Sequence, residues 1–214
     1  AGAPFTLFCY LVEGHGSKGF FVAKSFLFSE PAAADRLLDK LATQTIAYLT
    51  AQAEAGAQAL MVFDSWAGLL GPDTYARYAL PAVRKVLAGL APLGVPVIYF
   101  PNQGATLLDQ LRGLPLDVAG IDWRLPLSRA RAILGPEIAV QGNLDPAALM
   151  APTAELLHLT DRVLAEAGTA PGHIFNLGHG IEPVTDPDQV ARLVDHVHER
   201  TAAGTLAGGS GGRP

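Results

Sequence analysis

The sequence predicts an α/β protein, specifically a partial (β/α)8 TIM barrel of about six parallel βα units that lacks its first strands. Three observations lead to this fold class. Short apolar runs recur along the 214 residues, segments with helical periodicity separate these runs, and half of the chain (50%) is hydrophobic. Strands that alternate with helices form right-handed βαβ units and a parallel sheet.

Six short apolar runs are expected to be strands. They are Pro4–Tyr10, Gln58–Asp64, Val95–Phe100, Asp117–Ile121, Glu137–Gln141 and His173–Leu177. Each run is almost continuously apolar instead of alternating, which is typical of strands that are buried on both faces of a parallel sheet.

The clearest helix is expected from about Pro31 to Ala55, after Ser29 or Glu30 and before Gly56. Its leucines recur with the 3.6-residue period of an amphipathic helix, and proline and glycine stand where helices begin and end. A second helix is expected to begin near Asp73 and to be interrupted by Pro81, giving two pieces.

Four further helices are expected later in the chain: Leu107–Leu111, Ser128–Leu134, Thr153–Ala167 and one that ends near Glu199. In the last of these, Asp186 can cap the helix, Pro187 fits the first turn, and Gln189 can reach back as in a capping box. The glycine-rich tail, Thr201–Pro214, is expected to be disordered. The predicted domains are therefore an incomplete barrel over residues 1–199 and a tail over 200–214.

Six βα units fit either an open doubly wound sheet or most of an eight-stranded barrel, which normally needs about 250 residues. No Gly-x-Gly-x-x-Gly follows a strand and opens a helix, so the dinucleotide-binding fold lacks its fingerprint. The chain starts without methionine and enters an apolar run within four residues. We therefore expect a fragment or processed piece of a barrel.

Composition excludes several classes of function. The net charge is −5 and the 15 Lys and Arg residues are scattered, which argues against nucleic acid as a partner. No apolar run approaches the length of a membrane span, and no signal peptide is visible. Cys9 is the only cysteine, so an intrachain disulfide and a zinc site with two cysteine ligands are excluded. A cytoplasmic location is expected.

Polar side chains follow each predicted strand. They are Tyr10, Ser65, Asn102 with Gln103, Asp122, Asn143 with Asp145 after Gln141, and His179. In a barrel these strand ends converge on one rim and form one pocket, where hydroxyls, amides and carboxylates can bind a polar organic ligand. Each residue also has a structural interpretation. Tyr10 can be a core aromatic, Ser65 a helix cap and His179 a turn residue.

The remaining rim residues have structural interpretations of the same kind: Asp122 and Asp145 can hold loops, and Asn143 can bond loop backbone. Three weaker signals are discounted. The Gly14–Lys18 stretch lacks the spacing of a phosphate-binding P-loop and is interpreted as a flexible rim loop. His196 and His198 lie two apart on a helix and cannot share a metal. No Gly-x-Ser-x-Gly elbow supports a serine hydrolase.

Several motifs resemble the uroporphyrinogen decarboxylase family. They are Tyr10-Leu-Val-Glu-Gly with Gly16-Ser-Lys18, Phe63-Asp-Ser-Trp-Ala-Gly68, Gly120-Ile-Asp-Trp123, Gln141-Gly-Asn-Leu-Asp-Pro146 and Phe175-Asn-Leu-Gly-His-Gly180. They come in family order over about residues 1–199 and correspond to the carboxyl-terminal part of the family's (β/α)8 barrel. The resemblance implies a lyase that removes four acetate carboxyls of uroporphyrinogen III to give coproporphyrinogen III, without metal or organic cofactor.

The resemblance makes Tyr10, Ser65 and His179 substrate-binding residues. The family's catalytic aspartate and its arginine segment lie upstream of the matched region, so no catalytic residue is expected in this chain, and Asp64 and Asp122 are not assigned that role. The resemblance also implies a tetrapyrrole substrate, a homodimer and little turnover by this chain alone. Two alternatives stay open: a truncated barrel that acts as a binding or interaction piece, and a zinc-dependent thiol methyltransferase of the same superfamily.

Overall fold

The computed structural model describes residues 1–202, which form one parallel sheet with helices packed along it. The strands are β1 (Leu60–Asp64), β2 (Val97–Pro101), β3 (Val118–Gly120), β4 (Ala139–Leu144) and β5 (His173–Leu177). The longer helices are α1 (Pro4–Glu13), α2 (Phe21–Ser29), α3 (Pro31–Glu54), α5 (Leu80–Leu90), α6 (Leu127–Leu134), α7 (Thr153–Ala167) and α8 (Pro187–Ala202). Short helical turns connect them, including α4 (Pro72–Thr74) and the π-helix Tyr75–Ala79.

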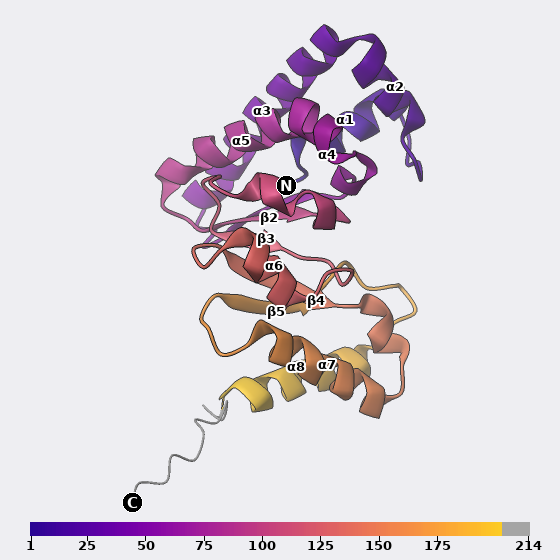
Figure 1. Cartoon of the computed structure of the whole chain (residues 1–214), viewed down its shortest axis with the longest axis vertical. Coiled ribbons are helices and arrows are strands. Elements are labelled where there is room, and N and C mark those ends of the chain that lie inside the picture. The colour runs from indigo at the N-terminus through magenta and orange to yellow at the C-terminus, as the bar shows by residue number, and fades with distance from the viewer. Residues whose placement is uncertain (203–214) are drawn as a thin grey trace, which may run out of the picture.

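The strands lie side by side in the order in which they occur in the sequence, and every neighbouring pair is parallel. A doubly wound sheet reverses its strand order at a switch point, whereas a barrel wall advances in one direction. The observed order is therefore that of a barrel wall. Figure 1 shows the same progression, from the indigo helices α1–α3 at one end to the yellow α8 at the other.

The first predicted strand, Pro4–Tyr10, is wrong: this segment is helix α1. Its buried residues include Phe5, Phe8 and Cys9, at the spacing of one helix face, and Pro4 occupies the first turn. Gly14 then ends the helix in the left-handed conformation, with φ of 77°. A seven-residue apolar run does not by itself distinguish a buried strand from a buried helix.

A parallel pairing nevertheless lies immediately before α1. Gly2 forms a parallel bridge with Phe63 of β1, Ala3 N donates to Phe63 O at 2.9 Å, and Phe63 N donates to Ala1 O at 3.0 Å. Within residues 1–202, β5 pairs only with β4. The sheet is therefore an open arc, with Ala1–Ala3 at one edge and β5 at the other.

The central strands β2, β3 and β4 are buried on both faces over almost their whole length, whereas β1 buries only one face. In β1, Leu60, Val62 and Asp64 are buried, whereas Phe63 is 42% exposed and Met61 is partly exposed. The buried face packs against the helices in the main hydrophobic cluster, and a smaller cluster lies between β4, β5, α7 and α8. Burial on both faces was predicted from the apolar runs, and the central strands confirm it. In β1 and β5, toward the two edges of the sheet, the face that would line a closed barrel is partly exposed.

The helices agree with prediction for α3, α6 and α7 and differ elsewhere in detail. The expected break at Pro81 does not occur, because the helix runs from Pro72 to Leu90 through the π-helical turn Tyr75–Ala79. The wider π turn alters the bonding just before proline, where an α-helix would clash. The expected helix Leu107–Leu111 is a single 3-10 turn, Leu108–Leu111, and another 3-10 turn, Gly104–Thr106, precedes it.

Helix α8 extends two residues beyond the predicted start of the tail, so Thr201 and Ala202 are helical. Residues 203–214, which hold the rest of the predicted disordered tail, lie outside the described residues. Asp186 caps the helix by accepting from Asp188 N at 3.0 Å, as predicted. Gln189 does not complete a capping box. It bonds instead to Thr153 Oγ1 and Ala151 O, and so joins α8 to the start of α7.

Candidate functional site

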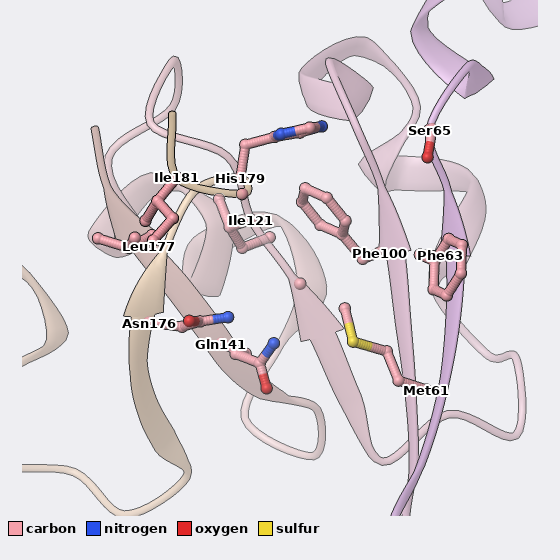
Figure 2. Close-up of a pocket in the computed structure, with 12 residues that line it drawn as sticks. Met61, Phe63, Ser65, Phe100, Ile121, Gln141, Asn176, Leu177, His179 and Ile181 are labelled. Atoms are coloured by element: carbon pink, nitrogen blue, oxygen red, sulfur yellow. The ribbon is translucent and has the colours of Figure 1, made fainter. Parts of the chain in front are cut away.

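A cavity of about 440 Å³ lies on the open face of the sheet, and all five strands contribute to its lining. Its walls are mainly apolar, with Phe63, Phe100 and Ile121 from β1, β2 and the loop after β3. Figure 2 shows Ser65 and His179 toward one end of the cavity and Gln141 and Asn176 away from that end. The cavity thus combines an apolar wall with polar groups at the carboxyl ends of the strands and deeper inside.

Two of the three predicted substrate-binding residues, Ser65 and His179, line this cavity. Ser65 directly follows β1, and His179 lies in the turn after β5, although the two residues are 114 positions apart in the chain. The exposed imidazole of His179 lies beside Phe100, with 6.4 Å between ring centroids. Among residues 1–202, neither the Ser65 hydroxyl nor the His179 ring has a side-chain hydrogen bond, so both are available to a ligand.

Tyr10 does not line the cavity, and it stands on α1 instead of at the end of a strand. Its ring is 44% exposed and packs edge-to-face on Phe20 and Trp66, with centroids 5.7 Å and 6.3 Å away. Phe20 and Trp66 are themselves in contact, at 4.7 Å. Tyr10 therefore packs against Trp66, the residue that follows Ser65 in the chain.

A buried carboxylate, Asp64, immediately precedes Ser65, and the sequence did not identify its role. Asp64 is 0% exposed, and it accepts hydrogen bonds from Thr6 Oγ1 at 2.8 Å and from Tyr99 OH at 3.0 Å. Tyr99 OH also lies 2.9 Å from Tyr75 OH. Burial raises the pKa of Asp64 to about 6, and the bonds from Thr6 and Tyr99 oppose this rise.

The other polar residues after the strands hold loops. Asp122 accepts from Gln103 N at 2.6 Å and from Arg124 N at 2.8 Å, which ties the loop after β2 to the loop after β3. Asn143 donates to Asp122 O and Leu125 O, and Asp145 accepts from Ala147 N. The structural interpretations of these three residues are therefore confirmed.

The turn that carries His179 is flanked by Gly178 and Gly180, and it packs closely against the loop after β3 at Gly178. Gly178 is buried, and a Cβ there would lie 2.7 Å from Trp123 N and 2.9 Å from Trp123 Cε3. Gly178 N also donates to Leu144 O at 2.7 Å. Glycine is needed at this position for close approach, whereas a Cβ at Gly180 would meet nothing within 4 Å.

The stretch Gly14–Lys18, predicted to be a flexible rim loop, forms a defined turn. Ser17 Oγ accepts from Phe20 N at 3.2 Å and Gly19 N at 3.4 Å, and Glu13 accepts from Ala23 N in α2 at 3.0 Å. Phe20 has a left-handed backbone, with φ of 45°, and its ring is fully buried. The turn thus places Phe20 under Tyr10.

Metal binding finds no support within residues 1–202, where no group of three or more His, Cys, Asp or Glu side chains could hold an ion. His196 pairs with Asp161 at 2.9 Å. Cys9 is fully buried, and burial raises the pKa of its thiol, so the thiolate that binds zinc is disfavoured. Over the same residues, no helix is long and apolar enough to cross a bilayer.

The sequence matches the family described as uroporphyrinogen decarboxylase (URO-D) over residues 1–200. It is 49% identical over 200 residues to the uroporphyrinogen decarboxylase of Syntrophotalea carbinolica, covering 94% of this chain and 58% of that protein. The enzymes of the same name from Myxococcus xanthus and Streptomyces griseus are 47% and 49% identical, with 60% and 55% of their lengths covered. The chain thus spans somewhat more than half the length of these relatives.

Two solved structures share the fold. A methyltransferase from Methanosarcina mazei superimposes with a TM-score of 0.77 at 20% identity, over 93% of this chain and 58% of that one. A putative vitamin-B12-independent methionine synthase from Listeria monocytogenes gives a TM-score of 0.58 at 16% identity, over 81% and 56%. At these identities the likeness concerns the fold alone.

Proposed function

We propose that this chain, which belongs to the uroporphyrinogen decarboxylase family, forms the substrate-hydrogen-bonding part of an enzyme that converts uroporphyrinogen III to coproporphyrinogen III. The observation that carries the proposal is the meeting of Ser65 and His179 in one cavity at the carboxyl ends of distant strands. This is the face on which parallel α/β barrels place their chemistry. Tyr10, beside Trp66, is proposed as the third substrate-binding residue.

The cavity suits one part of a tetrapyrrole. Its apolar walls, including Phe63 and Phe100, can contact pyrrole rings, and Ser65 and His179 can donate hydrogen bonds to carboxylate side chains. Its volume of about 440 Å³ lies at the lower end of the range for ligand sites. A tetrapyrrole that carries eight carboxylates would extend beyond it, across the open side of the sheet.

The cavity lacks the charged groups that complete the chemistry. None of its lining residues is Lys, Arg, Asp or Glu. Loss of CO2 leaves an electron pair that a protonated pyrrole ring accepts, and a nearby carboxylate stabilises that cationic ring. The family resemblance supplies this aspartate and the anion-binding arginines from a segment upstream of the matched region. We therefore propose that turnover requires that segment, and that the reaction uses no metal or organic cofactor.

Self-association as a homodimer in the cytoplasm is part of the same proposal. Large apolar side chains on α2 support it, because Phe21 is 75% exposed and Phe28 is 61% exposed. The alternative, a non-catalytic binding piece, is favoured by the open sheet edge at β5, which can pair with another polypeptide. The buried Cys9 disfavours the zinc-dependent methyltransferase.

Activity under anaerobic conditions tests the proposal. The chain would be assayed for coproporphyrinogen formation alone and together with the amino-terminal part of the Syntrophotalea carbinolica enzyme that it does not match. We expect little or no turnover alone and measurable turnover with the added segment. Ser65→Ala and His179→Ala should each lower kcat/KM by roughly 10- to 100-fold, since hydrogen bonds to charged groups contribute about 1.5–3 kcal/mol.

Two results separate the alternatives. Normal turnover by the chain alone would contradict the need for an upstream segment. A compact complex with the added segment that binds coproporphyrin but never turns over would favour the non-catalytic piece. Asp145→Ala is a matched control, because Asp145 caps a turn away from the cavity. This substitution should lower stability without a specific loss of activity.

A further inference from the structure

We propose that Asp64 is a positioning residue whose buried carboxylate joins helix α1 to the end of strand β1 and thereby fixes Tyr10 relative to Ser65. The inference rests on the proposed function, because it concerns two residues to which that function assigns substrate contacts. Asp64 itself does not line the cavity and would not touch the substrate.

Besides the backbone bonds of Ala1 and Ala3 to Phe63, the link runs through one side-chain hydrogen bond between distant parts of the chain. Thr6 Oγ1, on α1, donates to Asp64 Oδ1 at 2.8 Å, across 58 residues of sequence. Thr6 lies one helical turn before Tyr10, and Asp64 directly precedes Ser65. Both members of this pair are buried, at 1% and 0% exposure. Movement of Thr6 away from Asp64 would therefore move Tyr10 away from Ser65.

The other carboxylate oxygen is held from a different strand. Tyr99 OH, on β2, donates to Asp64 Oδ2 at 3.0 Å, and Tyr75 OH lies 2.9 Å from Tyr99 OH. Because each oxygen has its own donor, the orientation of the carboxylate plane is fixed. Within residues 1–202, no Lys or Arg forms an ion pair with Asp64. The carboxylate is thus oriented by the hydroxyls of Thr6 and Tyr99 together with the backbone N–H of Thr6.

The cost of burying this carboxylate argues for a role beyond stability. A buried charge without a cation is unfavourable, and an apolar residue of similar volume would avoid the desolvation penalty of the carboxylate. A leucine at position 64 would pack with Leu60 and Val62, which lie on the same buried face of β1. What a leucine cannot supply is an acceptor for Thr6.

Trp66 provides a direct readout of the junction. Its ring touches both Tyr10 and Phe20, at 6.3 Å and 4.7 Å between centroids, so its environment changes if α1 shifts. The chain has two tryptophans, and Trp123→Phe leaves Trp66 as the only one. Emission wavelength and acrylamide quenching in that background report on the junction without any ligand.

The experiment compares Thr6→Val, Thr6→Ser and Asp64→Leu in the Trp123→Phe background. Thr6→Val keeps the shape and removes the donor, whereas Thr6→Ser keeps the hydroxyl and should behave as the parent does. Thr6→Val and Asp64→Leu should both shift Trp66 emission to the red, raise its quenching and weaken coproporphyrin binding by about tenfold, the value of one hydrogen bond. Asp64→Leu also leaves the buried Tyr99 hydroxyl without this acceptor, so its thermal midpoint should fall by more than that of Thr6→Val.

Thr45→Val is the matched control, because Thr45 is a buried threonine on α3 whose hydroxyl has no partner among residues 1–202. It should leave Trp66 and binding unchanged. The inference is overturned if Thr6→Val and Asp64→Leu leave Trp66 emission and quenching at the parent values. Failure of the parent chain, with its upstream segment, to bind coproporphyrin would instead refute the proposed function, and the Trp66 measurements would still decide the role of Asp64.

Discussion

Asp64 couples the stability of the protein to pH. Burial raises its folded-state pKa to about 6, above about 3.9 in an unfolded chain. Between these values the folded state holds the proton and the unfolded state does not. The free energy of unfolding from this group is therefore highest below about pH 4 and falls by about 3 kcal/mol as pH rises to about 6.

We expect Asp64→Asn to remove this fall, because the amide does not ionise and can still bond to Thr6 and Tyr99, whose hydroxyls can donate or accept. Urea unfolding at pH 4.5 and pH 7.5 would measure it. The measured quantity is the free energy of unfolding of the variant minus that of the parent at each pH. Titrating groups present in both proteins, such as Asp35, whose pKa is lowered by Arg77, contribute equally and cancel in this difference. A difference that does not change with pH would contradict the assignment.

Gly178 should be the less replaceable of the two glycines around His179. Gly178→Ala places a Cβ against Trp123 N at 2.7 Å, so the turn or the Trp123 loop must move. We expect a loss of stability of about 1–3 kcal/mol, typical of overpacking, together with weaker coproporphyrin binding. Gly180→Ala is the control, since it meets no atom and should change either quantity little. Thermal unfolding and fluorescence titration would measure both.

Ser65 and His179 could be placed in one site from the sequence because each directly follows an apolar run, and parallel strands bring their carboxyl ends together. Asp64 and Thr6 could not. Their bond crosses 58 residues, and Thr6 stands in a run that gives no sign of a polar contact. Asp64 was visible as the end of a predicted strand, but alternation along β1 directs its side chain to the helix layer instead of the cavity.

Helix α1 yields a test that distinguishes it from the predicted strand. On a helix, Phe8 is buried and Leu11 is 62% exposed. Phe8→Ala should therefore cost about 3–5 kcal/mol, and Leu11→Ala should stay within about 0.5 kcal/mol. In a strand, Leu11 would share a face with Phe5 and Cys9, which are buried, and would be equally sensitive. Chemical denaturation of the two variants measures the difference.

Both ends of β1, β2, β3 and β4 lie within three residues of prediction, and β5 matches fully. Glycine or proline stands within two residues before each of these runs and so limited where the strand could begin. Such runs are too short for a helix of ordinary length. Pro4–Tyr10 continues into Leu11 and Val12 and so reaches helical length. Counting the apolar run through Val12 and noting Gly14 would have favoured the helix.

The open face of the sheet should bind apolar dyes, and addition of an upstream segment that completes the barrel should release them. Phe63 is 42% exposed and Ile174 is 44% exposed, and over residues 1–202 the edge strand β5 has β4 as its one partner. Burial of such side chains stabilises by about 1.5–3 kcal/mol each. We therefore expect the chain to bind 8-anilinonaphthalene-1-sulfonate and to release it on adding the upstream segment from Syntrophotalea carbinolica.

The edge strand gives this closure a specific test. Ile174→Lys places a charge on β5, which among residues 1–202 pairs only with β4, and should leave the stability of the isolated chain nearly unchanged, as for other exposed positions. In the closed complex the same lysine would face the added strands, so the affinity for the upstream segment should fall by at least tenfold. Val184→Lys, at a residue 80% exposed outside the sheet, is the matched control and should not weaken the complex. Equal affinities for both variants would mean that the segment binds away from β5, and that the sheet does not close into a barrel through this edge.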